Sequence, residues 1–433
     1  MAAQSAPLTE RKYVLPFVLI TSLFFLWAFG VNLNDVLIPH FKSAFSLSDF
    51  QSSFIQIAFF GGYFLAAFPA GRLMEHIGYK WGILTGLALC TAGAFLFVPA
   101  STAGLYGFFL AALFVMACGQ SFLEVASNPY ATILGPAESA ERRLNLAQSF
   151  NAVGAVIAML VGRYSILASR ESTPEQIAAM SAAQLRAFRA AQTATVRLPY
   201  VLIAGIFVFV GVLVLLAHLP DVVERKAHER QQGDPSWREV LGRPHLVKAV
   251  VAQFLYVGAQ VGVGSFVIRF AQHTMPGTTA QAAWRYLLGH WVGFMIGRFA
   301  GSAMMKSLAA SRLLTVFSAG ALICSVIALF ATGLLPVWAL VGIGFFHSIM
   351  FPTIFALGIK GLGPLTKRGS SLLVMAIVGG AILPAIMGKI SDLSNIQRAF
   401  WVPLLCYAYV LYFALRGYRP ATTPSASETT VTA

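Results

Sequence analysis

Charged side chains are scarce in this sequence. Only 11% of its 433 residues are Asp, Glu, Lys or Arg, whereas 58% are hydrophobic. A soluble domain averages about 25% charged residues, so this composition excludes an ordinary soluble protein and predicts a polytopic membrane protein. The formal net charge of +14 does not indicate a nucleic-acid partner. The basic residues lie in short segments between apolar runs, where they set the topology of a membrane protein.

Cysteine is also rare, and no catalytic motif is present. The four cysteines lie within apolar runs and form no CxxC pair, so they signal neither a disulfide framework nor a metal site. We interpret them as small buried apolar groups. No Ser/His/Asp or HExxH arrangement occurs either. We therefore expect neither an enzyme nor a bound cofactor. The first apolar run is too long for a cleavable signal peptide.

Long hydrophobic runs fill most of the chain. A helix needs about 20 apolar residues to cross the hydrocarbon core of a bilayer, and its amides must be paired internally. The sequence therefore predicts an all-α integral membrane protein with 12 transmembrane helices. The expected spans are 14–40, 50–72, 79–99, 104–132, 143–168, 198–219, 246–272, 282–303, 311–333, 335–358, 369–390 and 398–417.

The spans divide into two groups of six. The longest charged stretch, Asp221–His245, follows the sixth span. Residues 129–155 and 352–381 share an order of Pro, Leu-Gly-Pro, basic residues, Ser and a small-residue helix face. This internal repeat predicts two six-helix half-bundles with a binding site between them near the midplane.

The distribution of Lys and Arg places both termini in the cytoplasm. The segment from Ser169 to Leu198 is an exception, which we interpret as a longer loop on the opposite side. The expected domains are a cytoplasmic N-terminal tail (1–12), an N-terminal half (13–220), a cytoplasmic linker (221–245), a C-terminal half (246–417) and a disordered cytoplasmic tail (418–433).

Two acidic residues, Asp35 and Glu124, lie inside apolar spans. A charged side chain at the centre of a bilayer costs about 2.5–3.5 kcal/mol on insertion scales. Neutral residues could join helices at a lower cost, so we expect these two acids to carry protons or to bind a polar substrate.

Polar side chains accompany both acids at helical spacing. Asn32 and Asp35 share one helix face, as do Gln120, Glu124 and Asn128, spaced by four. Such stripes face the interior of a bundle, although Asn and Gln can also simply bond helices together. Further polar or aromatic candidates are Gln148 and Asn151, then Gln253, Tyr256 and Gln260, and the rings of Trp27, Tyr63, Phe122, Tyr130 and Phe150.

Four other ionisable residues lie within or near the ends of spans. For His290 and His347 we favour a hydrogen-bonded packing role over a proton relay. Arg269 and Arg298 lie near span ends, where we expect long cationic side chains to reach the membrane surface.

The segment between the second and third spans carries a motif. It resembles the signature loop of the major facilitator superfamily, Gly-x-Leu-x-Asp-x-x-Gly-x-Lys, with Glu75 in the place of Asp. Glycines permit close helix approach and a tight turn. The acid and the basic groups could pair across the cytoplasmic mouth, whereas the alternative is a plain charged turn. The expected gating loop comprises Gly71, Arg72, Glu75, Gly78 and Lys80.

Longer strings carry a more specific resemblance, which extends from about residue 12 to 415. FFLWAFGVNLNDVLIPHFKSAF, FLEVASNPYATILGP, RLNLAQSFNAVGA, FLYVGAQ, PTIFALGIKGLG and GSSLLVMAIVGGAILPAIMG resemble the fucose–galactose–glucose:proton symporters. The resemblance implies that Asp35 and Glu124 are essential and that Gln148 and Asn151 bind sugar. The expected substrate-binding set is Asn32, Asp35, Gln120, Glu124, Asn128, Gln148, Asn151 and Gln260.

The resemblance further implies proton-coupled monosaccharide uptake by alternating access across a bacterial inner membrane, with the proton as coupling ion. L-fucose is the first expectation. Val31 and Gly264 replace a further asparagine and a bulky aromatic of the L-fucose carriers, so glucose, galactose and N-acetylglucosamine stay open. A drug:proton antiporter and a transport-dead sugar sensor are the rival functions. The expected partners are the sugar, the proton and the bilayer, and we expect a monomer.

Overall fold

The computed structural model describes residues 6–45, 49–165, 180–219 and 236–419. Within the first helix, the side chains of residues 33–44, including that of Asp35, are outside the description. Every regular element in the described ranges is a helix.

The N-terminal part of the chain forms five long helices and one shorter one. Each long helix extends over one or two of the predicted apolar runs. They are α1 (Val14–Phe45), α2 (Asp49–Ala103), α3 (Tyr106–Ile133), α4 (Ala140–Ser165), α6 (Ala182–Ala194) and α7 (Arg197–Leu216).

The C-terminal part begins with the short helix α9 (Trp237–Leu241) and continues in longer helices. Pro352 has no N–H for the carbonyl of Ser348, and the break between α13 and α14 falls at that point. The elements are α10 (Pro244–Thr274), α11 (Ala280–Met304), α12 (Ala310–Phe330), α13 (Leu335–His347), α14 (Met350–Ile359), α15 (Thr366–Met375), α16 (Gly379–Leu393) and α17 (Trp401–Tyr412).

Ten helical segments of the described chain are long and apolar enough to cross a membrane. One of them, Phe54–Ala103, contains two predicted spans, which are separated by the non-helical Gly78 (φ 73°). Helix α11 matches the predicted span 282–303 but is not among the ten. It carries Arg285, His290 and Arg298, which lower its mean hydropathy. Counting α11 and both parts of α2, the described part of the chain has twelve candidate membrane spans, the number that the sequence predicts.

One expectation about local structure was wrong. We interpreted the segment from Ser169 to Leu198 as a loop, but helix α6 occupies residues 182–194 of it. The helix begins with a capping box. The Gln184 amide donates to the Ser181 hydroxyl at 3.3 Å, and the Ser181 amide donates to the Gln184 side chain at 2.9 Å. Two otherwise unpaired amides are thereby satisfied, which stabilises a helix that lacks a long apolar run.

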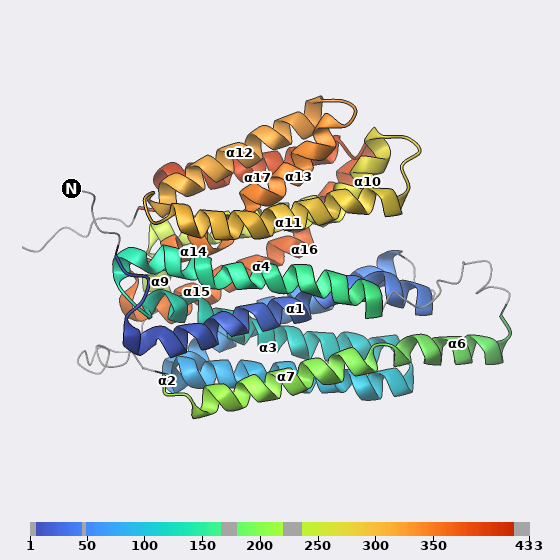
Figure 1. The fold of residues 1–433 in the computed structure, drawn as a ribbon, viewed down its shortest axis with the longest axis horizontal. Coiled ribbons are helices and arrows are strands. Elements are labelled where there is room, and N and C mark those ends of the chain that lie inside the picture. The colour runs from blue at the N-terminus through green and yellow to red at the C-terminus, as the bar shows by residue number, and fades with distance from the viewer. Residues whose placement is uncertain (1–5, 46–48, 166–179, 220–235, 420–433) are drawn as a thin grey trace, which may run out of the picture.

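The helices form two bundles that are joined at one end. In Figure 1 the N-terminal helices α1–α7 form the lower bundle, and the C-terminal helices α10–α13 and α17 lie above it. At the left, α14 contacts α3 and α4, and α15 contacts α2 and α3. Toward the right, α10, α11 and α12 slope away from α1 and α4.

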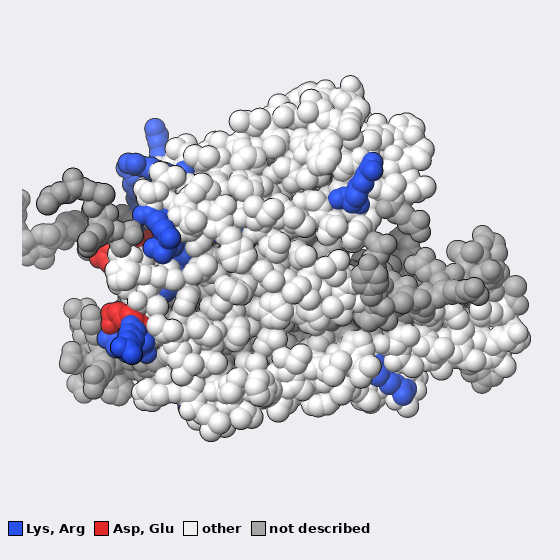
Figure 2. Space-filling view, in the orientation of Figure 1, with Lys and Arg blue, Asp and Glu red and all other residues white. Residues whose placement is uncertain are grey.

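Basic side chains gather at the end where the bundles meet. On the face shown in Figure 2, Lys and Arg lie mainly at the left, over the start of α4 and the end of α11, and others lie near the opposite end. The middle of this face is without charge. We call the left end the basic end; it includes Lys80, Arg142, Lys306, Lys360 and Arg368. A charge-free middle between two charged ends is the surface that a lipid bilayer requires.

Close packing of α2 against α3 leads to a first prediction. A Cβ at Gly119 would lie 2.5 Å from the Cys90 amide nitrogen and 2.6 Å from the Gly86 carbonyl oxygen, and neither backbone atom can rotate away. Gly119→Ala should therefore destabilise the protein by about 1–3 kcal/mol, the usual cost of overpacking. Thermal unfolding in detergent would measure this loss.

Gly107→Ala is the matched control on the same helix, because a Cβ there meets no atom within 4 Å. It should leave the thermal midpoint unchanged or raise it slightly, since Ala favours helix more than Gly does. Equal midpoints for the two variants would contradict the close approach of α2 and α3.

Candidate functional site

Glu124 lies inside the bundle on α3, and only 7% of its surface is exposed. The Tyr63 hydroxyl of α2 donates a hydrogen bond to its carboxylate. Asn128 lies one turn further along α3, and the guanidinium of Arg298 interacts with the carboxylate through its charge. A buried carboxylate must be compensated by charge and hydrogen bonds or be protonated. Glu124 therefore has the setting of a group that can take up and release a proton.

A chain of polar contacts leads from this acid to the other bundle. The Gln148 amide of α4 donates to Asn128 Oδ1 at 2.7 Å. Arg298 of α11 donates to both the side-chain oxygen and the backbone carbonyl of Gln148, each at 2.7 Å. Asn128, Gln148 and Arg298 thus form one hydrogen-bonded chain from α3 through α4 to α11, and Glu124 joins this cluster through its charge interaction with Arg298.

Arg298 corrects an expectation from the sequence. We expected it to reach the membrane surface, but only 3% of it is exposed and its guanidinium points to Gln148. Arg269 does remain exposed, over the Phe266 ring. The two arginines looked alike in sequence because the distance of a residue from a helix end does not show which side faces a neighbouring bundle.

The other predicted polar residues vary in their surroundings. Gln120 and Gln253 are fully buried, and none of their side-chain amide atoms has a hydrogen-bond partner. Asn151 and Gln260 are half-buried. Asn32 donates to the backbone carbonyl of Ala28 at 2.8 Å, so in this structure it bonds within its own helix.

Asp35 belongs to helix α1, but its side chain lies outside the described residues. The structure therefore does not test its expected proximity to Glu124.

The two histidines form a separate cluster in the C-terminal half. His290 Nδ1 contacts the Leu340 carbonyl at 2.8 Å, and His347 Nε2 contacts the Tyr407 hydroxyl at 2.5 Å. The Tyr256 hydroxyl donates to the His347 carbonyl at 2.9 Å. Both histidines are fully buried. The second ring nitrogen of each, His290 Nε2 and His347 Nδ1, is buried without a hydrogen-bond partner among the described residues, so the packing role stays a prediction.

The predicted gating loop joins the halves at the basic end. Glu75 accepts two hydrogen bonds from Arg368 of α15, at 2.6 and 2.8 Å. Lys367 donates to the Met74 carbonyl at 2.7 Å. A Cβ at Gly71 would lie 2.7 Å from that of Ser371, so only glycine allows this approach of α2 to α15.

The basic residues of the loop itself are placed differently. Lys80 donates to the carbonyls of Leu215 and Ala217 at 2.8 and 2.9 Å, where its charge caps the C-terminus of α7. Arg72 is exposed. The sequence thus identified the acid of this ion pair but not its partner, which comes from a segment 293 residues away.

A second set of contacts joins α4 to the C-terminal half. Lys360 forms a salt bridge with Glu141 at 2.7 Å, and the Asn145 side chain donates to the Thr353 hydroxyl at 3.2 Å. The residues in these two contacts belong to the two copies of the internal repeat, so the repeats meet at the basic end. The described hydrogen bonds between the halves lie in the part of the molecule between this end and the Arg298 cluster.

Comparison with known proteins identifies the family of this chain. The Major Facilitator Superfamily model matches residues 20–383. The chain is 43% identical to the L-fucose-proton symporter of Escherichia coli (strain K12), over 94% of this chain and 93% of that protein. It is 40% identical to the glucose/galactose transporter of Brucella abortus biovar 1 (strain 9-941), over 94% and 95% of the two chains.

Solved structures agree. FucP, a transporter crystallised in the outward conformation, superimposes with a TM-score of 0.86 at 42% identity, covering 94% of this chain and 99% of that one. The proton:xylose symporter XylE superimposes with a TM-score of 0.68 at 13% identity, which is a likeness of fold alone. These matches confirm the predicted fold class, an all-α membrane protein of twelve helices in two six-helix halves.

The ion pairs at the basic end lead to a second prediction. The side chains of Arg368 and Glu75 are only 5% and 12% exposed, whereas those of Lys360 and Glu141 are 58% and 11% exposed. A double-mutant cycle with Glu75→Gln and Arg368→Gln should give a coupling energy of about 1–3 kcal/mol in the stability of the detergent-solubilised protein. The matched cycle with Glu141→Gln and Lys360→Gln should give less than about 1 kcal/mol, because water screens that pair. Equal coupling in the two cycles would contradict this ranking.

Proposed function

The chain belongs to the major facilitator superfamily, and on that premise we propose that it is a sugar:proton symporter of a bacterial inner membrane. It carries a monosaccharide inward by alternating access, and the proton is its coupling ion. The observation that supports this most directly is the buried Glu124 carboxylate within a polar cluster that joins the two halves. We propose that it works as a monomer, is not an enzyme and needs no cofactor.

L-fucose is the first candidate substrate, because the relative at 43% identity is an L-fucose-proton symporter. Glucose or galactose is the second, because the relative at 40% identity is a glucose/galactose transporter. One local feature favours the second candidate. At Gly264, where L-fucose carriers have a bulky aromatic, a Cβ would contact only Trp291, at 3.9 Å. We propose that glycine in place of an aromatic beside Trp291 favours a sugar other than L-fucose.

The basic end is proposed to face the cytoplasm, since Lys and Arg are enriched on that side of membrane proteins. Both termini then lie in the cytoplasm. Residues 13–220 and 246–417 form the two halves, joined by the linker 221–245, with tails at 1–12 and 418–433. In this orientation the contacts at the basic end close the cytoplasmic side. The likeness to a relative in the outward conformation supports this state.

Glu124 and Asp35 are proposed to load protons from the outside. When Glu124 is ionised, it holds Arg298 by charge; when it is protonated, that attraction is lost. Arg298 also occupies the side-chain oxygen of Gln148, a predicted sugar-binding group. Protonation of Glu124 would therefore free Arg298 and Gln148 to bind sugar hydroxyls, which couples the two ligands through one cluster.

The remaining predicted groups complete the proposed site. Gln120 and Gln253 have unpaired buried amides, and an unpaired buried amide is costly unless a ligand or water satisfies it. Asn32, Asn128, Asn151 and Gln260 are proposed to contribute further hydrogen bonds to the sugar.

The gating loop is proposed to act as a latch of the cytoplasm-closed state. Glu75 and Arg368 must separate when the cytoplasmic side opens, whereas Gly71 and Gly78 set the approach and turn of α2. Lys80 holds the loop to the end of α7 through its two hydrogen bonds. Arg72 is the exposed residue of the loop.

Proton uptake with sugar is the direct test of this function. Purified protein in liposomes, without an imposed gradient, should cause the external medium to become more alkaline when L-fucose is added, because each inward sugar takes a proton with it. A pH electrode measures the change, and mannitol serves as a sugar-alcohol control.

The outcomes separate the candidate functions. A response to glucose or galactose, or to N-acetylglucosamine, but not to L-fucose keeps the mechanism and changes the substrate. Acidification on addition of an apolar cation would instead indicate a drug:proton antiporter. Binding of sugar with neither accumulation nor a pH change would indicate a sensor.

The role of the carboxylates gives a further prediction. Glu124→Gln should lower proton-driven sugar accumulation by about tenfold or more, within the range of coupling between two ligands. Exchange of labelled for unlabelled sugar should persist, because exchange needs no net proton transfer. Asp35→Asn is expected to behave in the same way.

Glu138→Gln is the matched control, since it makes the same chemical change at an exposed position. It should accumulate sugar as the unchanged protein does. Normal accumulation by Glu124→Gln would rule out Glu124 as a coupling group.

A further inference from the structure

Two helix–helix interfaces between the halves share a sequence pattern but differ in charge. Helix α2 packs against α15, and helix α11 packs against α4. At the basic end, α2 carries Gly71 followed by Met74 and Glu75, whereas α11 carries Gly301 followed by Met304 and Met305. The position that matches Glu75 is therefore Met305, and a lysine, Lys306, follows it.

With Met305 in the place of Glu75, helix α11 supplies no acid to the α4/α11 interface. In the α2/α15 interface, Glu75 neutralises Arg368. In the α4/α11 interface, Arg142 and Lys306 form no ion pair with any carboxylate in the described part of the chain. The neighbouring acid Glu141 is bound to Lys360, and Glu138 is exposed.

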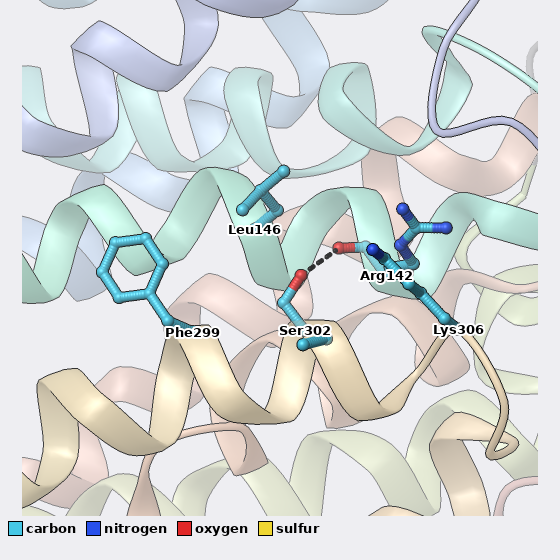
Figure 3. A pocket seen from close by; sticks show the side chains of 6 residues that line it. Arg142, Leu146, Phe299, Ser302 and Lys306 are labelled. Carbon is cyan, nitrogen blue, oxygen red and sulfur yellow. Dashed lines mark hydrogen bonds between the residues drawn. The ribbon is translucent and has the colours of Figure 1, made fainter.

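The two cations lie at the edge of a pocket. It has a volume of about 220 Å³ and lies between α4 and α11. In Figure 3, Arg142 and Lys306 lie at one end of the pocket and Phe299 at the other, with Leu146 and Ser302 between them. Ser302 donates to the Arg142 carbonyl at 3.5 Å, which is a weak link across the interface. The pocket thus joins a cationic end to an apolar end.

The apolar end continues along the surface. Phe150 and Phe299 are 40% and 39% exposed, and their ring centroids lie 5.9 Å apart. Ile296, one turn further along α11, is 54% exposed. Their exposed apolar surface offers an acyl chain a place to lie while its headgroup reaches the cations.

We propose that the α4/α11 pocket binds one anionic phospholipid of the cytoplasmic leaflet. Its phosphate lies between Arg142 and Lys306 and takes the place that Glu75 has in the other interface. Its acyl chain packs on Leu146, Phe299 and Phe150. Because the two cations come from different halves, the bound lipid stabilises the cytoplasm-closed state. The proposal uses the membrane orientation proposed above but not the transport activity.

Lipid binding to the detergent-solubilised protein tests this directly. Native mass spectrometry during titration with phosphatidylglycerol should show one tight site. Arg142→Gln/Lys306→Gln should weaken that site by about tenfold or more, since each basic residue near a membrane surface strengthens attraction to anionic lipid. Phosphatidylcholine, which has no net charge, should bind the two proteins equally.

Arg312→Gln/Arg416→Gln is the matched control. Both arginines are exposed and neither lines the pocket, so the double change removes the same charge without altering the proposed site. This control should bind phosphatidylglycerol like the unchanged protein. Arg142→Lys should retain the site, and equal thermal midpoints for all variants would show that folding is intact.

Three outcomes would overturn the proposal. The first is equal phosphatidylglycerol affinity in the unchanged protein and Arg142→Gln/Lys306→Gln. The second is an equal loss in the control variant, which would indicate attraction to the surface as a whole. The third is displacement of the lipid by millimolar inorganic phosphate, which would indicate a site for free anions.

Discussion

A carboxylate inside a membrane bundle needs compensation, and the arrangement around Glu124 follows from that need. Tyr63 supplies a hydrogen bond from α2, and Arg298 supplies opposite charge from α11. Arg298 is itself buried, and it donates twice to Gln148. Because the acid and the cation belong to different halves, electrostatic compensation and contact between the halves are the same interaction. A change in the charge of Glu124 therefore acts on the interface that must open during transport.

At the basic end, a second set of charged side chains also joins the two halves. Glycine at position 71 lets α2 approach α15 closely enough for Glu75 and Arg368 to pair, and Lys367 then reaches the Met74 carbonyl. Both sets of contacts hold the halves together on one side only, while the opposite ends diverge (Figure 1). Closure at one end is the condition for alternating access, since a site open to both sides would leak. In the α4/α11 interface, by contrast, Arg142 and Lys306 have no ion pair with a carboxylate in the described part of the chain.

Several features could be predicted from the sequence because they depend on local composition. The apolar runs gave the helices within a few residues, since the cost of unpaired amides in lipid leaves no alternative to a helix. The turn at Gly78 followed from its motif, and its φ of 73° is a conformation that glycine adopts without strain. Helix α6 was missed because its stability comes from the capping of Ser181 and Gln184 and from packing, not from a hydrophobic run.

The site was only partly predictable, because some of its residues are recognised from local sequence and others only from the packing of distant helices. Glu124, Asn128 and Gln148 were identifiable, because a polar stripe on an apolar helix is visible in one dimension. Arg298 and the pairing of Glu75 with Arg368 were not, because each depends on how helices far apart in sequence are placed against each other. The sequence by itself determined that the chain is a twelve-helix membrane protein with costly buried acids, since burial costs belong to residue types. Only the tertiary structure decided which cations compensate those acids and which end is closed, since charge pairing depends on distances between helices.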